Sequence, residues 1–194
     1  MINSTKFKVE IEQWVGALQS ATRVLLTSPG AADGDSIGAQ LALRQMILQS
    51  FPKISVLIIN DEPLPLRYQF LPGAQFVHTP ESFLLAKESA LFDVAIIVDG
   101  GIDRAGRVRS FFEKAKTTVF IDHHAVSVEF PYTIRIVEPV ASSTTELMYH
   151  LSQTESFKTK VGSEFAQLIY LGLVFDTGFF RHSNTTPEVM ELSA

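Results

Sequence analysis

Residues 94–101 read Val-Ala-Ile-Ile-Val-Asp-Gly-Gly, and residues 118–124 read Thr-Val-Phe-Ile-Asp-His-His. Each stretch is a short apolar run that ends on an aspartate. Such runs, without alternating polar residues, are typical of strands that are covered on both faces, as in a parallel sheet. We therefore predict buried strands at 94–98 and 118–121, with polar side chains at their carboxyl ends.

The same pattern extends along the rest of the chain. Two further strands are expected at Val24–Ser28 and Ile54–Ile59. Helical spacing of apolar residues predicts helices over 9–21, 37–49, 81–90, 102–114, 144–153 and 162–173. Strands that alternate with helices imply right-handed crossovers and a mainly parallel α/β sheet. In such a sheet the ligand site lies beyond the carboxyl ends of the strands.

Composition excludes several classes of protein. The 194 residues are 46% hydrophobic and 19% charged, so the chain is not disordered and suffices for one sizeable core. No apolar run approaches the ~20 residues of a membrane helix, and the N-terminus does not resemble a signal peptide. The absence of cysteine excludes disulfides and thiolate metal sites and is compatible with a cytoplasmic protein. A net charge of −5 argues against a broad basic surface for duplex nucleic acid.

Carboxylates and imidazoles fall at the predicted ends of separate elements. They are Asp33 and Asp35 after the first strand, Asp99, then Asp122, His123 and His124, and finally Asp176 after the last long helix. Clustered carboxylates repel one another unless a cation neutralises them. Oxygen ligands with a few imidazoles suit Mn²⁺ or Mg²⁺, with Fe²⁺ or Co²⁺ as alternatives. Two such ions about 4 Å apart can activate water for phosphoryl displacement.

Each of these motifs also has a purely structural interpretation. Asp33 before a helix is typical of an N-cap, and Asp99 before two glycines is typical of a turn. The adjacent His123 and His124 point in different directions on extended backbone, so at most one is expected to be a ligand. Asp176 could simply end its helix. The positions nevertheless converge on one edge of the predicted sheet, which favours a site.

Two further segments are candidates for binding phosphate. Ser142 and Ser143 open a hydroxyl-rich run, and Ser143 with Glu146 fits a helix capping box. A capped helix N-terminus also attracts phosphate, so both interpretations stay open. Arg181 could bind a phosphate through its guanidinium, or it could be an ordinary surface residue.

The ordered motifs resemble those of the DHH phosphoesterase family. They are residues 33–38 (Asp-Gly-Asp-Ser-Ile-Gly), Asp99, residues 122–124 (Asp-His-His), residues 142–147 (Ser-Ser-Thr-Thr-Glu-Leu) and residues 176–178 (Asp-Thr-Gly). Residues 66–73 and 180–187 look like the branch that contains oligoribonuclease/pAp phosphatases, the nanoRNases. Five motifs in order are a much more specific signal than any single short motif.

This resemblance implies a Rossmann-like, three-layer DHH domain and a set of roles for the quoted residues. Asp33 and Asp99 would hold one Mn²⁺, and Asp35, Asp99, His123 and Asp176 a second, with Mg²⁺ or Co²⁺ as alternatives. His124 would lie near the scissile phosphate, with Asp122 orienting the histidines. The family's smaller C-terminal DHHA1 domain has no counterpart here, so residues 1–194 are expected to be the catalytic DHH domain alone.

The implied activity is hydrolysis of a short single-stranded oligonucleotide or a pAp-like nucleotide by a hydroxide that bridges the two metals. A cytoplasmic location, no membrane and a homodimer are compatible with it. One departure matters, because Pro29 stands where the family has a histidine ligand of the first metal. A degenerate, non-hydrolysing nucleotide-binding protein is therefore an alternative function. A related pyrophosphatase or polyphosphatase is another.

Overall fold

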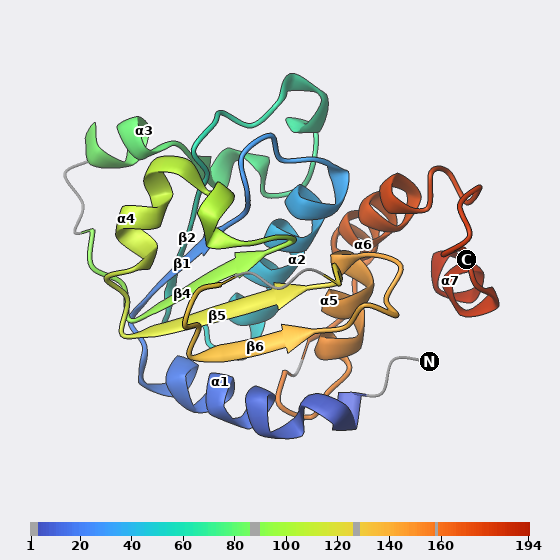
Figure 1. Ribbon diagram of the computed structural model, residues 1–194, viewed down its shortest axis with the longest axis horizontal. Helices are drawn as coiled ribbons and strands as arrows, with labels where there is room; N and C mark the ends of the chain where they lie inside the picture. Colours follow the sequence, from blue (N-terminus) through green and yellow to red (C-terminus); the bar gives the residue numbers. More distant parts are fainter. Residues whose placement is uncertain (1–3, 86–89, 126–128, 158) are drawn as a thin grey trace.

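The computed structural model describes residues 4–85, 90–125, 129–157 and 159–194. A six-stranded parallel sheet forms its centre, with strand order β3-β2-β1-β4-β5-β6 (Figure 1). The strands are β1 (Arg23–Thr27), β2 (Ser55–Ile59), β3 (Val77–His78), β4 (Val94–Val98), β5 (Thr117–Asp122) and β6 (Ile134–Val137). The order reverses between β1 and β4, and ligand sites of doubly wound sheets lie at such a reversal.

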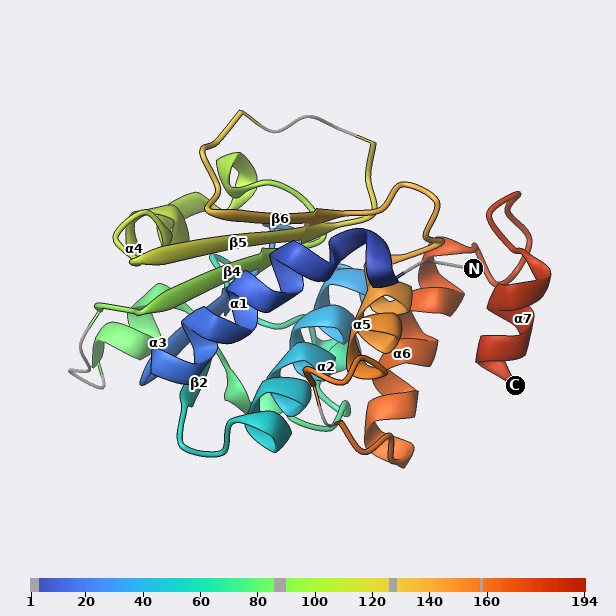
Figure 2. The same cartoon turned by 90° about the horizontal axis from the view of Figure 1, so that it is seen from below.

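Helices cover both faces of the sheet and make three layers. The α-helices are α1 (Lys8–Ser20), α2 (Gly34–Ser50), α3 (Pro80–Leu85), α4 (Arg109–Phe112), α5 (Thr144–Ser152), α6 (Ser163–Asp176) and α7 (Pro187–Ser193). Short 3₁₀ helices occupy Ser4–Phe7, Leu66–Tyr68, Ala74–Phe76, Ile102–Arg104 and Gly106–Val108. Figure 2 shows α1, α2, α5 and α6 on one face and α4 on the other. The structure thus confirms the predicted Rossmann-like α/β fold.

Alternate residues of the strands belong to two separate hydrophobic cores. In β4, Ile96 and Val98 pack into the larger core with α1, α2, α5 and α6, whereas Ala95 and Ile97 pack into the smaller one. Phe112 of α4 belongs to that smaller core. Because every residue of β4 is buried, the strand reads as a continuous apolar run.

The four predicted strands are confirmed, but one predicted helix is wrong. The expected helix over 102–114 is divided into two 3₁₀ turns and the single turn of α4. Gly106 has a φ of +53°, a left-handed conformation that an α-helix cannot include. The short strands β3 and β6 and the helix α7 were not predicted from the sequence. Up to Leu85 the expected helix over 81–90 corresponds to α3, and residues 86–89 lie outside the described residues.

Two glycines allow α2 and α6 to pack unusually close together. A Cβ on Gly38 of α2 would lie 2.6 Å from the carbonyl oxygen of Leu168 in α6. A Cβ on Gly172 of α6 would lie 2.3 Å from a carboxylate oxygen of Asp35 in α2. This close approach brings the first turn of α2 and the C-terminal turns of α6 to the same edge of the sheet.

Among the described residues, no helix combines the length and the apolar character that crossing a bilayer requires.

We predict opposite effects of alanine at two helical glycines. Gly38→Ala should lower the free energy of unfolding by about 1–3 kcal/mol, because the new Cβ meets the backbone of α6. Gly16→Ala is the matched control: Gly16 is exposed in α1, with no atom within 4 Å of a new Cβ. That change should raise the unfolding free energy by up to about 1 kcal/mol through better helix propensity. Urea denaturation measures both, and equal effects would contradict the packing argument.

Candidate metal centre

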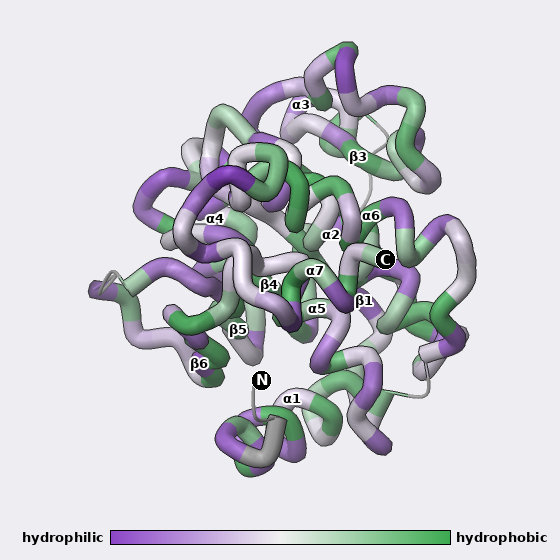
Figure 3. The backbone as a smooth tube through the Cα atoms, turned by 90° about the vertical axis from the view of Figure 1, so that its right-hand side faces the viewer, coloured by the Kyte–Doolittle hydropathy of each residue, from purple (hydrophilic) through white to green (hydrophobic). Residues whose placement is uncertain are grey.

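The acidic motifs meet at the carboxyl edge of the sheet. Asp122 is the last residue of β5, and Asp99 directly follows β4. Asp35 lies in the first turn of α2 and Asp176 is the last residue of α6. Figure 3 looks at the molecule from the side to which the strand arrows point in Figure 1, and shows hydrophobic segments in the middle with hydrophilic loops around them.

His123 lies at the centre of this cluster. Its Nε2 is 2.9 Å from Oδ2 of Asp176, 3.8 Å from Oδ1 of Asp99 and 4.0 Å from Oδ2 of Asp35. Its Nδ1 lies 3.3 Å from the carbonyl oxygen of Ala141, which fixes the ring orientation. Nε2 is buried and has no partner of hydrogen-bonding geometry among the described residues.

The N-terminus of α5 holds the Asp35 carboxylate. The backbone N–H of Thr144 donates to Oδ2 at 2.6 Å, and the N–H of Thr145 donates to Oδ1 at 2.9 Å. These are two of the N–H groups that the first turn of a helix leaves without an intrahelical partner. The side chain of Asp35 is fully buried, so its orientation is set by these two bonds.

Asp99 takes a left-handed backbone conformation with a φ of +62°. Its carboxylate is almost fully buried, and Oδ1 accepts a hydrogen bond of 3.1 Å from Oγ1 of Thr144. A non-glycine residue at positive φ carries a conformational cost of about 1–3 kcal/mol and is concentrated at functional sites. The strain at Asp99 turns its carboxylate back over the end of the sheet, towards His123.

His124 and Asp122 form a second pair at the mouth of the cluster. Nδ1 of His124 is 2.7 Å from Oδ1 of Asp122, which also accepts the His124 backbone N–H at 3.1 Å. The Asp122 carboxylate is buried, whereas the His124 side chain is 49% exposed. A buried carboxylate therefore orients a half-exposed imidazole that external molecules can reach.

The donor set fits a divalent cation. Asp35, His123 and Asp176 each offer an atom within 4.8 Å of the others, and so do Asp99, His123 and His124. Oxygen-rich sets with an imidazole suit Mn²⁺, Mg²⁺ or Co²⁺. The buried Nε2 of His123 faces three carboxylates without a partner of hydrogen-bonding geometry among the described residues, which is the arrangement expected of a metal ligand.

Without a cation the carboxylates oppose one another electrostatically. Burial, followed by the charges of Asp35, Asp33 and Asp176, raises the pKa of Asp99 to about 10. Burial and the charge of Asp176 raise the pKa of Asp35 to about 6. Burial lowers the pKa of His123, but the carboxylates of Asp176 and Asp35 outweigh it and raise that pKa to about 9. Protons therefore occupy the cluster where a cation would otherwise balance the charge.

Asp33 is engaged as the N-cap of α2. Its Oδ1 accepts the backbone N–H groups of Asp35 and Ser36, each at 3.0 Å, and the Ser36 hydroxyl at 3.1 Å. Among the described residues, Asp33 belongs to neither group of converging ligand atoms. The capping interpretation of Asp33 is confirmed, and its role as a metal ligand stays a prediction.

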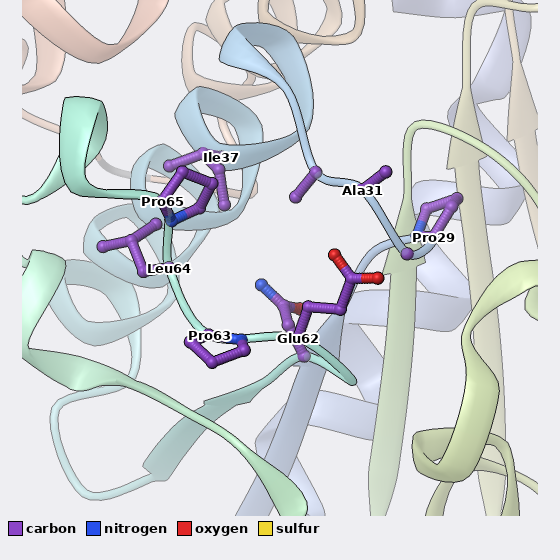
Figure 4. A pocket seen from close by; sticks show the side chains of 10 residues that line it. Pro29, Ala31, Ile37, Glu62, Pro63, Leu64 and Pro65 are labelled. Carbon is purple, nitrogen blue, oxygen red and sulfur yellow. The ribbon is translucent and has the colours of Figure 1, made fainter.

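Pro29 lines a pocket beside Asp33. Figure 4 shows the carboxylate of Glu62 directed towards Pro29 and Ala31, with Pro63, Pro65 and other apolar residues completing the wall. The side chain of Pro29 offers no donor atom to a cation. Glu62 is exposed and, within the described part of the chain, belongs to neither group of converging ligand atoms.

The predicted phosphate-binding residues have internal partners. Both the N–H and the hydroxyl of Ser142 donate to Oε2 of Glu146 at 2.7 Å, and the Ser143 hydroxyl accepts the Glu146 N–H at 3.0 Å. The Glu146 carboxylate thus reaches the residue before the N-cap, a shifted form of the predicted capping box. Arg181 is exposed, and its Nε donates to the carbonyl of Gly178 at 2.8 Å. Substrate binding by all three residues stays a prediction.

Two residues near the cluster were missed by the sequence analysis. Thr144 touches both Asp35 and Asp99, and Asn184 donates to the carbonyls of Ser142 and Asp176. Both lie in quoted motifs, so the signal was present. Thr144 contacts Asp35, which lies 109 positions away in the sequence, and Asn184 contacts Ser142, which lies 42 positions away. No local sequence pattern encodes such contacts.

Comparison with known proteins gives a family match over most of the chain. The family described as "DHH family, N-terminal domain" matches residues 23–173. A protein of Mycoplasma pneumoniae named "Bifunctional oligoribonuclease and PAP phosphatase NrnA" is 26% identical over 189 residues, covering 96% of this chain and 56% of its own length. A protein of the same name from Thermus thermophilus is 29% identical over 168 residues, covering 84% of this chain and 45% of its own length.

A solved structure shares the fold. The crystal structure of an exopolyphosphatase-related protein from Bacteroides fragilis superposes with a TM-score of 0.84 at 23% identity. The match covers 95% of this chain and 55% of the other. The chain therefore spans about half the length of the relatives it matches.

The raised pKa values predict how the stability of the metal-free protein depends on pH. In the folded protein, the pKa values of Asp35, Asp99 and His123 are all above their ordinary values. The contribution of these groups to the free energy of unfolding is therefore complete at low pH and is lost as pH rises. We expect the melting temperature in EDTA to fall between pH 5 and pH 8. Mn²⁺ should raise it, and more so at pH 8, because the cation replaces protons.

Asp99→Asn supplies the control for this experiment. It removes the carboxylate with the most strongly raised pKa, so the slope of melting temperature against pH should become shallower. Scanning calorimetry at fixed ionic strength measures both proteins. A melting temperature that rises with pH in EDTA, or that ignores Mn²⁺, would contradict the electrostatic account.

Proposed function

The chain belongs to the DHH family, and from that premise we propose that it is a metal-dependent phosphoesterase that hydrolyses short oligonucleotides or pAp-like nucleotides. The observation that carries the proposal is the buried Nε2 of His123, which has no partner of hydrogen-bonding geometry among the described residues and faces the carboxylates of Asp35, Asp99 and Asp176. At the level of the family, the relatives support a hydrolase of phosphoester bonds.

Asp35, Asp99, His123 and Asp176 are the residues that would hold the cation, which we propose to be Mn²⁺. When bound, a divalent cation supplies positive charge for the phosphoryl oxygens and makes a water molecule more acidic. The chain contributes a preorganised set of donors, because Thr144, Thr145 and Ala141 fix three of the side chains before any cation arrives. The proposal includes a second cation, which Asp33 and Asp99 would hold.

His124 is positioned to transfer a proton at the mouth of the site. With Nδ1 held by the buried Asp122 carboxylate, the opposite ring nitrogen is left for an external partner. Such a pair can donate a proton to the leaving oxygen of a phosphoester and then be reprotonated from solvent. We assign His124 as the general acid and Asp122 as the group that orients it.

The substrate class rests on the relatives and on charge. The two NrnA relatives are named for oligoribonuclease and PAP phosphatase activity, which are both phosphoester hydrolyses. The net charge of −5 favours a small substrate that enters one cation-bearing site over a long duplex that needs a basic surface. A cytoplasmic location and a homodimer are also predicted.

A second candidate function is a nucleotide-binding protein that does not hydrolyse. Pro29 favours it, because the resemblance places a metal-ligating histidine at that position. The capping role of Asp33 favours it too, since Oδ1 already accepts three hydrogen bonds. A pyrophosphatase or polyphosphatase shares the same donor set, and hydrolysis of pyrophosphate in place of nucleotides would favour it.

We expect hydrolysis of pAp or of a labelled dinucleotide with Mn²⁺ and none with EDTA. His124→Ala should lower kcat by about 10²–10⁴-fold, the usual contribution of a general acid. His78→Ala is the control, because His78 lies on the edge strand β3 and should leave kcat unchanged. Nucleotide binding without turnover in Mn²⁺, Mg²⁺ and Co²⁺ would support the degenerate alternative, and full activity of His124→Ala would remove the assigned general acid.

Calorimetric titration with Mn²⁺ should distinguish the two candidate cation positions. The ligands around His123 should bind Mn²⁺ tightly. The position at Asp33 and Asp99, where Pro29 replaces the histidine that the resemblance implies, should bind Mn²⁺ at least tenfold more weakly. Pro29→His should narrow this difference and raise kcat. Pro29→Ala is the matched control, since it removes the ring without adding a ligand. Two equally tight sites in the unmodified protein would show that Pro29 does not impair the first position.

A further inference from the structure

One side-chain amide connects two of the elements that carry candidate metal ligands. Nδ2 of Asn184 donates to the carbonyl oxygen of Ser142 at 3.1 Å and to the carbonyl oxygen of Asp176 at 3.3 Å. Asn184 lies in the loop between α6 and α7, and Ser142 lies just before α5. An amide nitrogen has two hydrogens, so each carbonyl can receive one of them.

One accepting carbonyl belongs to a candidate ligand, and the other belongs to the neighbour of a residue that contacts a candidate ligand. Asp176 carries the carboxylate that lies 2.9 Å from Nε2 of His123. The residue before Ser142 is Ala141, whose carbonyl oxygen lies 3.3 Å from Nδ1 of the same imidazole. Asn184 therefore binds the backbone next to both partners of the contact between the Asp176 carboxylate and the His123 imidazole.

The loop conformation explains how Asn184 returns to the site. Gly178, Phe179 and Phe180 all have φ values near +60°, so the chain reverses sharply after α6. The N–H groups of Arg181 and His182 then donate to the carbonyl of Thr177, each at 2.9 Å. This reversal points the following residues back towards Asp176.

We propose that Asn184 is a positioning residue that fixes the Asp176 carboxylate relative to His123, and so sets the affinity of the site for a divalent cation. The inference rests on the proposed function, since it concerns the same cation. Without the amide, the carbonyls of Ser142 and Asp176 lose their shared donor. The end of α6 can then shift relative to the segment that orients His123.

Other contacts at Asp176 cannot replace this one. Nδ1 of His182 lies 3.2 Å from the carbonyl oxygen of Asp176, but His182 is exposed and no described contact connects its ring to Ser142. The Ser142 N–H and hydroxyl are both committed to Glu146. The His123 imidazole contacts Asp176 and Ala141 in the same two segments. Asn184 joins these segments through their backbone carbonyls, so it holds them in place around the imidazole.

The test replaces the amide without changing its size. Asn184→Asp keeps the shape of the side chain but removes both N–H donors and places a carboxylate beside two carbonyl oxygens. Mn²⁺ affinity, measured by calorimetry on the full chain, should fall by about 10–100-fold, the usual effect of losing a group that orients a ligand. With Co²⁺ as the probe, the visible absorption spectrum should change in shape or intensity, because the ligand geometry is altered.

Two further variants keep the result interpretable. Ser183→Ala, at the exposed neighbouring residue of the same loop, should leave the Mn²⁺ affinity and the Co²⁺ spectrum unchanged. Asn184→Ser, whose hydroxyl is too short to join both carbonyls, replaces Asn184→Asp if circular dichroism shows that the latter is unfolded, and the same loss of affinity is expected.

The outcomes separate this inference from the proposed function. Unchanged Mn²⁺ affinity and Co²⁺ spectrum in the folded Asn184 variant, while the unmodified chain binds, would overturn the positioning role alone. Failure of the unmodified chain to bind either cation would overturn the proposed function and this inference together. Weaker binding by the Asn184 variants and normal binding by Ser183→Ala would support both.

Discussion

The contact between the Asp35 carboxylate and the N-terminus of α5 is the interaction on which the site depends. Two helix N–H groups, from Thr144 and Thr145, bind one buried carboxylate that comes from another helix. The contact satisfies donors that the helix cannot satisfy itself and gives the carboxylate the positive end of a helix dipole. The absence of a side chain at Gly172 leaves the space that this carboxylate occupies. Helix packing and ligand orientation are therefore the same structural feature.

The charge of the cluster explains why burial and function are connected. Buried carboxylates destabilise a fold unless they are protonated, hydrogen-bonded or bound to a cation. Here the pKa values of Asp35 and Asp99 are raised although both accept hydrogen bonds. The retained acidity is most simply explained by a cation that the folded chain is built to bind.

The segment from Ala141 to Glu146 has a structural role in addition to the substrate contacts predicted for its hydroxyl groups. Its hydroxyls bond to neighbouring residues and to Asp99, while its backbone orients His123 and Asp35. The sequence predicts phosphate contacts or a helix cap for Ser142 and Ser143, and the bonds that they make within the chain are those of a cap. Taken alone, the net charge of −5 argues against a broad basic surface for duplex nucleic acid. With the acidic residues gathered around His123, it instead supports a requirement for a cation.

The sequence by itself determined the alternation of strands and helices, the parallel sheet and the identity of most candidate ligands. Buried strands must be apolar throughout, and ligands must be carboxylates or imidazoles, so both can be recognised in the local sequence. It could not locate the break at Gly106 or the edge strand β6, because these depend on backbone conformation and on a neighbouring strand. Only the tertiary structure decided that Thr144 holds two aspartates and that Asn184 joins the end of α6 to the segment before α5. Hydrogen bonds between distant segments have no local signature, since any polar residue can make them once the fold brings a partner within reach.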